Sequence, residues 1–228
     1  MPFMRDPFAR ILTDRLRFSV WGGGIFAFLL SAIYTLILPA AFGIFATEAG
    51  ALASPSDFSD MGILLIIAPA VWIYYLWQTQ GIPGVFTTLV RSAQNPGAMN
   101  DEVERQRQSH GRSAWHVIVS FAIACGLSLL NVRLSWTALG ETWTTYNWQM
   151  IAAMQVIRLP VFYMVSMIII KLGISSILIN RIVTRQPLKI ILMHPDGRGG
   201  VSGLGMYAIA SAAIIPLAGL YLGLVLAR

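Results

Sequence analysis

Long runs of apolar residues, separated by short polar segments, dominate this sequence. A helix rises about 1.5 Å per residue, so about 20 apolar residues cross a hydrocarbon core of about 30 Å. Five runs have suitable length and hydropathy, at residues 20–45, 61–77, 115–134, 150–171 and 204–226. Backbone groups in lipid must be hydrogen-bonded within their own segment, and no alternating strand pattern occurs. The sequence therefore predicts an all-α fold, a polytopic transmembrane helical bundle of about five spans that forms a single integral membrane domain over residues 1–228.

The composition favours a membrane protein over a soluble one. Hydrophobic residues make up 56% of the chain and charged residues 11%, whereas a soluble domain has about 25% charged residues. The net charge is +6, but the basic residues flank the apolar runs, as expected for contact with lipid head groups. We therefore expect the lipid bilayer, and no nucleic acid, as a partner. The only cysteine, Cys125, excludes an intramolecular disulfide.

Positive charges alternate between the predicted loops. Four arginines precede the first span and none lies between the first and second spans. Four follow the second span, one lies at the end of the third, four basic residues follow the fourth, and one ends the chain. Because cytoplasmic loops are enriched in Lys and Arg, this pattern predicts a cytoplasmic N-terminus and an outside C-terminus. The absence of a transit or retention signal favours the inner (plasma) membrane of a bacterium.

The predicted cytoplasmic loop, residues 79–113, contains two different segments. Residues 83–91 have their apolar side chains on one helical face, which predicts a short amphipathic helix along the inner membrane interface. Residues 95–112 carry charges of mixed sign and are expected to form a turn followed by a solvated segment. Neither segment is predicted to span the bilayer.

The fourth apolar run is longer than a bilayer requires. Helical character continues from residue 150 to about residue 183, which is roughly 50 Å of helix. The extension, residues 172–183, is mainly apolar, and apolar surface in water costs about 25 cal/mol per Å². We therefore expect this extension to pack against residues 83–91, another subunit or a partner protein. The alternative is a strongly tilted helix that stays in the membrane.

One face of the fourth span carries small and polar residues at helical spacing. The stripe consists of Gln155, Arg158, Ser166, Gly173, Ser176 and Asn180. Such stripes form close helix contacts with interhelical hydrogen bonds, and the alternative is a water-lined path. No acidic residue lies well inside a predicted span, so we expect Arg158 to lack a carboxylate partner within the chain. This pattern favours an anion path or a subunit contact, although the Arg158 side chain could instead snorkel to the outer interface.

Other polar residues are expected nearer the membrane surfaces. His116 and Asn131 lie near the two ends of the third span, where we expect both in the interface. A glycine-rich segment before the fifth span is a candidate anion or lipid head-group site, because such a turn exposes backbone N–H groups. Its members are His194, Asp196, Arg198, Gly199 and Gly200. The alternative is a flexible re-entry turn, since the spacing matches no phosphate-binding or dinucleotide motif.

No catalytic or metal-binding motif accompanies these features. The sequence contains no HExxH, no GxSxG and no Cys and His spacing typical of zinc, and it indicates no cofactor. We therefore expect a non-enzymatic integral membrane subunit that assembles through its helices with other subunits or copies of itself. Two alternatives remain open. One is a homo-oligomeric channel or transporter for an anion, and the other is a membrane enzyme that acts on lipid or phosphate through His194 and Asp196.

Overall fold

A computed structural model of the chain describes residues 6–41, 55–111, 114–137, 139, 145, 147–185, 188 and 202–226. Within these residues the named elements are all helices, and one isolated β-bridge pairs Ala93 with Leu188. Five helices are long and apolar enough to cross a membrane. The predicted all-α fold with five candidate spans is therefore confirmed, while its orientation in the membrane stays a prediction.

The elements follow one another in a simple up-and-down order. The N-terminal segment forms α1 (Pro7–Arg10) and the π-helical turn η1 (Ile11–Arg15). The first span comprises α2 (Val20–Ala32), η2 (Ile33–Ile37) and α3 (Leu38–Ala41). The second comprises α4 (Pro55–Gly62), η5 (Ile63–Ile67) and α5 (Ala68–Arg91). After them come α6 (Pro96–Gly111), α7 (Trp115–Thr137), α8 (Trp148–Arg185), α9 (Ser202–Ala212) and α10 (Ile214–Leu226).

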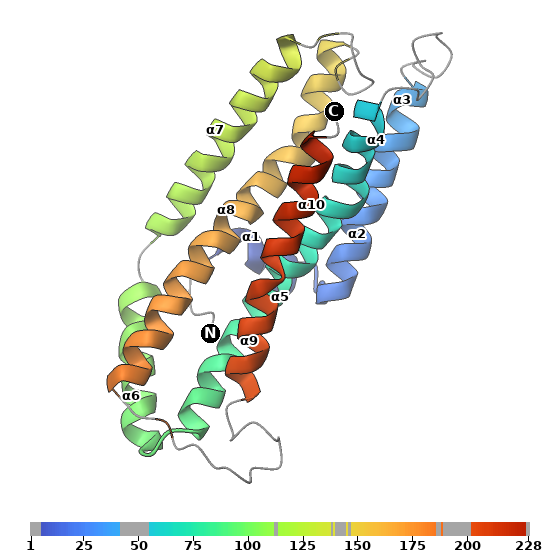
Figure 1. Ribbon diagram of the computed structural model, residues 1–228. Helices are drawn as coiled ribbons and strands as arrows, with labels where there is room; N and C mark the ends of the chain where they lie inside the picture. The colour runs from blue at the N-terminus through green and yellow to red at the C-terminus, as the bar shows by residue number, and fades with distance from the viewer. Residues whose placement is uncertain are drawn as a thin grey trace.

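The helix α5 lies at the centre of the bundle. It packs against α2, α8 and α9, whereas α7 packs chiefly on α8 (Figure 1). The short α1 lies among the long helices near the middle of the bundle rather than beyond its end (Figure 1). The fold therefore brings the N-terminal segment into contact with residues from distant parts of the chain.

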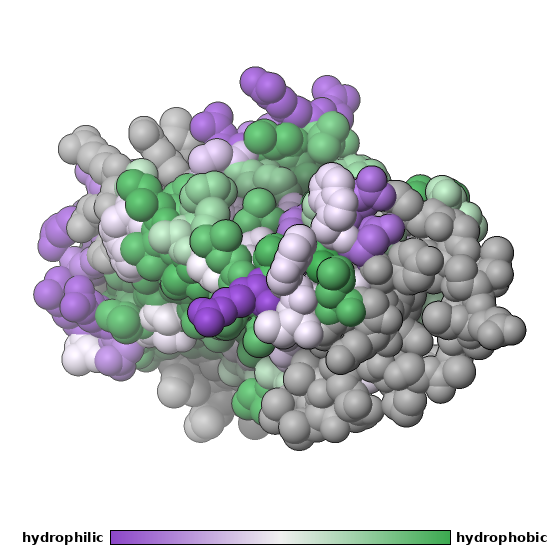
Figure 2. Space-filling model, turned by 90° about the horizontal axis from the view of Figure 1, so that it is seen from above, coloured by the Kyte–Doolittle hydropathy of each residue, from purple (hydrophilic) through white to green (hydrophobic). Residues whose placement is uncertain are grey.

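The outer surface of the bundle is apolar. Leu129 of α7 is 71% exposed and Ile215 of α10 is 73% exposed. Figure 2, a view from the upper end of Figure 1, shows apolar side chains (green) reaching the surface between polar ones (purple). A soluble monomer rarely exposes such large apolar patches, whereas a membrane protein presents them to lipid.

Helix distortions coincide with prolines in three of the spans. The π-helical turns η2 and η5 end two residues before Pro39 and Pro69, and the break between α9 and α10 precedes Pro216. Proline has no N–H and its ring collides with the carbonyl four residues earlier, so the preceding turn must loosen. The distorted turn η5 borders the cavity described below.

The long fourth helix is confirmed, and its lower part packs within the chain. The helix α8 has 38 residues, which is about 57 Å. Leu178 and Ile182 are completely buried in an apolar cluster that includes Phe86 and Leu89 of α5. Of the predicted alternatives for residues 172–183, packing against residues 83–91 is therefore the one that the structure shows.

One prediction about the loop at residues 79–113 is wrong. Residues 83–91 do not form a separate interfacial helix, because α5 continues without interruption through Pro83 to Arg91. The segment that was expected to be solvated forms the helix α6, which exposes Asp101, Glu104 and Arg105. Its opposite face packs within the chain, since Met99 of α6 is completely buried in the same cluster as α5 and α8.

The charges of α6 are used in part for contacts with α8. The Glu102 carboxylate, which is only 5% exposed, accepts hydrogen bonds from Arg105 at 2.9 Å and from Gln106 at 3.0 Å. It also accepts one from Arg185, at the end of α8, at 2.8 Å. A charge run that was expected to face solvent therefore joins two helices.

Candidate functional site

Asp6 and Lys171 form an ion pair inside the bundle. Asp6 precedes α1 and Lys171 belongs to α8, and both side chains are at least 95% buried. Asp6 Oδ2 accepts hydrogen bonds from Lys171 Nζ at 2.5 Å and from the Tyr75 hydroxyl at 2.7 Å. Asp6 Oδ1 accepts from the Tyr163 hydroxyl at 3.1 Å and from the Ala9 amide at 3.2 Å. A buried charge requires such full hydrogen bonding, because its desolvation is otherwise not compensated.

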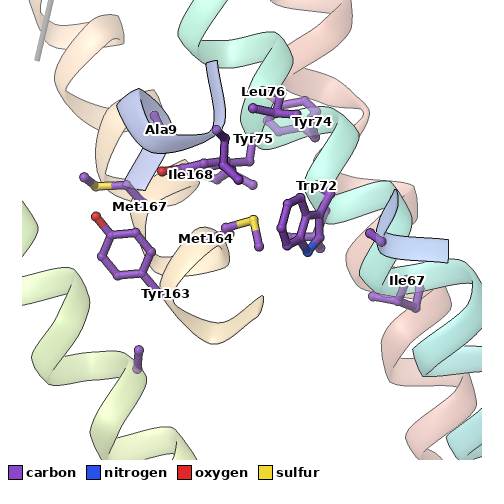
Figure 3. Close-up of a cluster of buried hydrophobic side chains, with 14 residues drawn as sticks. Ala9, Ile67, Trp72, Tyr74, Tyr75, Leu76, Tyr163, Met164, Met167 and Ile168 are labelled. Atoms are coloured by element: carbon purple, nitrogen blue, oxygen red, sulfur yellow. The ribbon is translucent and has the colours of Figure 1, made fainter. Parts of the chain in front are cut away.

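Aromatic and apolar side chains enclose this ion pair. Phe8 of α1 packs edge-to-face on Tyr163, with ring centroids 5.8 Å apart, and on Trp72 at 6.1 Å. Figure 3 shows α1, with Ala9, beside the side chains of α5 and α8 that form this cluster. The Lys171 ammonium lies 4.8 Å from the centroid of the Tyr75 ring. The pair therefore anchors α1 in the core.

The electrostatics of Asp6 agree with an anchoring role. Burial raises the pKa of Asp6. The Lys171 charge and the hydrogen bonds from Lys171 and Tyr75 together lower it by more than burial raises it, so the pKa lies below its ordinary value of 3.8. Asp6 is therefore ionised at neutral pH. The pair is hard to recognise in the sequence, because Asp6 lies in an arginine-rich segment that indicates membrane topology. The one signal in the sequence was a lone lysine inside a helix that continues on both sides of it.

Arg158 lies in a second polar network, which joins α8 to α7 and α4. Its Nη1 donates a hydrogen bond to Asn131 Oδ1 at 2.9 Å, and its Nη2 lies 3.9 Å from Asp60 Oδ1. Gln155, one turn earlier, donates to the same Asn131 oxygen at 3.2 Å and accepts from the Ser128 hydroxyl at 2.7 Å. These contacts fix α7, whose other sides are apolar, to α8.

One prediction about polar residues is corrected by this network. Arg158 does have a carboxylate neighbour, because α4 runs directly into η5 and so makes Asp60 part of the second helix rather than of the loop. Asn131 accepts hydrogen bonds from Gln155 and Arg158 of α8. His116, the second residue of α7, is 99% buried. The depth of both residues in the membrane stays a prediction.

The predicted polar stripe of α8 does not form one surface. Gln155 and Arg158 face α7, whereas Ser166 is buried and donates a hydrogen bond to the Phe162 carbonyl at 2.8 Å. The helix α7 lies beside the upper part of α8 only (Figure 1). The lower members of the stripe are consequently exposed, namely Gly173, Ser176 and Asn180.

The second predicted site lies outside the described residues. It consists of His194, Asp196, Arg198, Gly199 and Gly200. Among the residues that the structure does describe, no group of three or more His, Cys, Asp or Glu side chains could hold a metal ion.

A cavity of about 410 Å³ lies beside Arg158, between the second span, α7, α8 and α10. This volume is within the range of about 300–1,000 Å³ typical of ligand sites. Its polar lining includes Asp60, Asn131 and Arg158, and most of the remaining wall is aliphatic. The aliphatic wall comprises residues of η5, of α8 after Arg158, and of α10. The cavity therefore combines a charged end with an apolar body.

The helix α10 carries two glycines on an exposed face. Gly219 and Gly223 are four residues apart, and nothing lies within 4 Å of the position that a Cβ atom would occupy at either one. At Gly23 of α2, by contrast, Leu76 of α5 fills that space. Small residues four apart allow two membrane helices to approach closely. The α10 face is thus shaped for helix packing but has no neighbour among the described residues.

The fold defines an α-helical integral membrane protein with five candidate spans. No protein-family model matches the chain, and comparisons with curated proteins and with solved structures find no similar protein. Function is therefore argued from the geometry of these sites alone.

Proposed function

We propose that the chain is a non-enzymatic integral membrane subunit that assembles with a second copy of itself through the face of α10 formed by Gly219 and Gly223. The observation that carries this proposal is the open space at both glycines on an exposed, apolar helix. Lipid chains are as apolar as the helix, so association in a membrane depends on close backbone packing. Gly219 and Gly223, on successive turns of α10, provide a flat surface that allows such close packing.

A second copy fits this face better than an unrelated chain. The residues of α10 that line the cavity include Leu217 and Tyr221, and the helical repeat places Gly219 and Gly223 on the opposite side. The same glycine face on another copy is complementary to it, since copies inserted in the same direction present identical surfaces across a two-fold axis. The face is therefore suited to a symmetric dimer that leaves the cavity uncovered.

The buried ionisable groups support a structural role. Asp6 and Lys171 neutralise each other inside the core and attach α1 to α5 and α8. Such a pair, enclosed by aromatic side chains, contributes to the specificity of the fold rather than to chemistry. This arrangement favours a subunit over an enzyme.

The test is the mass of the native particle, measured on the full chain in a mild detergent and in lipid nanodiscs. We expect a dimer, and we expect Gly219→Ile and Gly223→Ile to increase the monomer fraction about tenfold, because a β-branched side chain separates the helix backbones. The matched control is Gly173→Ile on α8, where the glycine is also exposed with open space around it.

Three outcomes contradict this proposal. A wild-type monomer excludes self-assembly, and a particle in which other chains are present in fixed ratio indicates a larger complex instead. If Gly173→Ile dissociates the particle while both α10 variants leave it intact, the contact belongs to the exposed stripe of α8.

A further inference from the structure

We infer that the cavity beside Arg158 binds one zwitterionic phospholipid, with the phosphate at Arg158, the ammonium group at Asp60 and one acyl chain along the apolar wall. This site is separate from the α10 face, so it does not depend on the proposed self-assembly. The inference rests on the shape of the cavity, the unused donors of Arg158 and the pairing of opposite charges at one end.

The apolar lining of the cavity is long enough for a hydrocarbon chain. It includes residues of α8 from Arg158 to Ile169, eleven residues along the helix or about 17 Å. Leu64 and Ile67 of η5 and Leu217 of α10 also line the cavity. An apolar space of this kind is poorly suited to water, which needs several polar partners. A single hydrocarbon chain fits it.

The cavity is accessible from the lipid phase. Two of its lining residues, Leu127 of α7 and Ile169 of α8, are 39% and 58% exposed on the outer surface of the bundle. Both lie on apolar helices that are long enough to span the membrane. A molecule that enters between these helices therefore comes from the bilayer and brings its own hydrocarbon chain with it.

Arg158 has donors to spare at the polar end. A guanidinium has five N–H donors in a planar fork that matches phosphate. Among the described residues, Arg158 makes one hydrogen bond, to Asn131, and its Nη2 is 3.9 Å from Asp60, which is beyond hydrogen-bonding distance. The remaining donors can bind the oxygens of a phosphodiester.

The neighbouring carboxylate decides which head group is preferred. Asp60 and Arg158 both line the cavity, so the polar end has no net charge from this pair. The phosphate of an anionic head group would be attracted by Arg158, but the nearby Asp60 carboxylate would repel its negative charge. A head group with a phosphate and an ammonium complements the charges of both side chains. Phosphatidylethanolamine has this chemistry, whereas phosphatidylglycerol has only the phosphate.

The experiment is native mass spectrometry of the full chain released from nanodiscs that contain equal amounts of phosphatidylethanolamine and phosphatidylglycerol. The wild type should retain one phosphatidylethanolamine molecule. Asp60→Asn leaves Arg158 as the only charge of the pair and should shift the preference toward phosphatidylglycerol by about tenfold. The matched control is Asp101→Asn, which removes an exposed carboxylate on α6.

A second variant tests the apolar body without changing the charges. Val165 of α8 lines the cavity, and Val165→Trp should fill it and reduce the retained lipid about tenfold, because an occupied space excludes the chain. Val119→Trp on α7 is the control, since Val119 is exposed and is not part of the cavity wall.

The inference is overturned by any of three results. These are equal retention of the two lipids by the wild type, an unchanged lipid preference in Asp60→Asn, and unchanged retention in Val165→Trp. If Asp60→Asn does not give a monodisperse protein, the lipid preference of the wild type and the lipid retention of Val165→Trp decide whether the inference stands.

Discussion

The carboxylate of Asp6, which precedes α1, and the ammonium of Lys171 in α8 are bonded inside the bundle although 165 residues separate them in the chain. Tyr75 and Tyr163 complete the hydrogen bonds of the carboxylate. The N-terminal segment is therefore part of the core, and α5 and α8 are joined through it.

Breaking this pair should destabilise the protein strongly. Lys171→Met leaves the buried Asp6 carboxylate without its counter-charge, and the loss of one partner of such a pair costs about 3–5 kcal/mol. In the double variant Asp6→Asn with Lys171→Met, no unpaired charge remains, so we expect a smaller loss than for Lys171→Met alone. Thermal unfolding in detergent measures both.

The control for these two variants is Asp14→Asn. It removes a carboxylate that is 64% exposed and lies 3.7 Å from Arg10. Exposed ion pairs contribute about 0–1 kcal/mol to the free energy of unfolding, so the midpoint of thermal unfolding should hardly change. A double variant less stable than Lys171→Met would show that the two side chains do not act as a pair.

Stability should fall in acid through the titration of Asp6. Its pKa in the folded protein is below the ordinary value of 3.8 because Lys171 and the hydrogen bonds outweigh the effect of burial. The unfolded chain therefore binds this proton more readily, and the stabilisation that is present above pH 3.8 is lost as the pH falls through the lower, folded-state pKa. We expect the unfolding temperature of the wild type to approach that of Asp6→Asn over this range.

The comparison between these two proteins isolates Asp6 from other acids. Hydrogen bonds from Gln106 and Arg185 lower the pKa of Glu102 as well, but Glu102 is present in both proteins. A difference in unfolding temperature that stays constant from pH 7 to pH 3 would argue against the ionised state of Asp6.

Asn131 should be important for the attachment of α7. Its side-chain oxygen accepts hydrogen bonds from Arg158 and Gln155, so Asn131→Leu leaves two donors of α8 without this acceptor. An unsatisfied buried polar group costs about 1–3 kcal/mol, and we expect a loss of this size in thermal unfolding together with faster hydrogen exchange in α7.

Asn180→Leu provides the same change at an exposed position of α8. It should leave both the unfolding midpoint and the exchange of α7 unchanged. Equal effects of the two substitutions would mean that the polar network is not what holds α7.

The sequence by itself determined the class of fold and the number of candidate spans. Apolar runs are a local property, and a bilayer of fixed thickness converts them directly into helices. For the same reason the long helix α8 could be predicted, and the excess apolar length of residues 172–183 correctly indicated a packing partner. The orientation in the membrane stays a prediction from the pattern of basic residues.

Only the tertiary structure decided which polar residues meet. Asp60 and Arg158 are brought together because α4 and η5 form one helix beside α8, and Asp6 reaches Lys171 because α1 enters the bundle. The helix α6 likewise depends on the surface formed by α5 and α8. Hydropathy measures how apolar each stretch of the chain is. An ion pair or a cavity depends instead on distances in space between segments that can be more than a hundred residues apart in the chain.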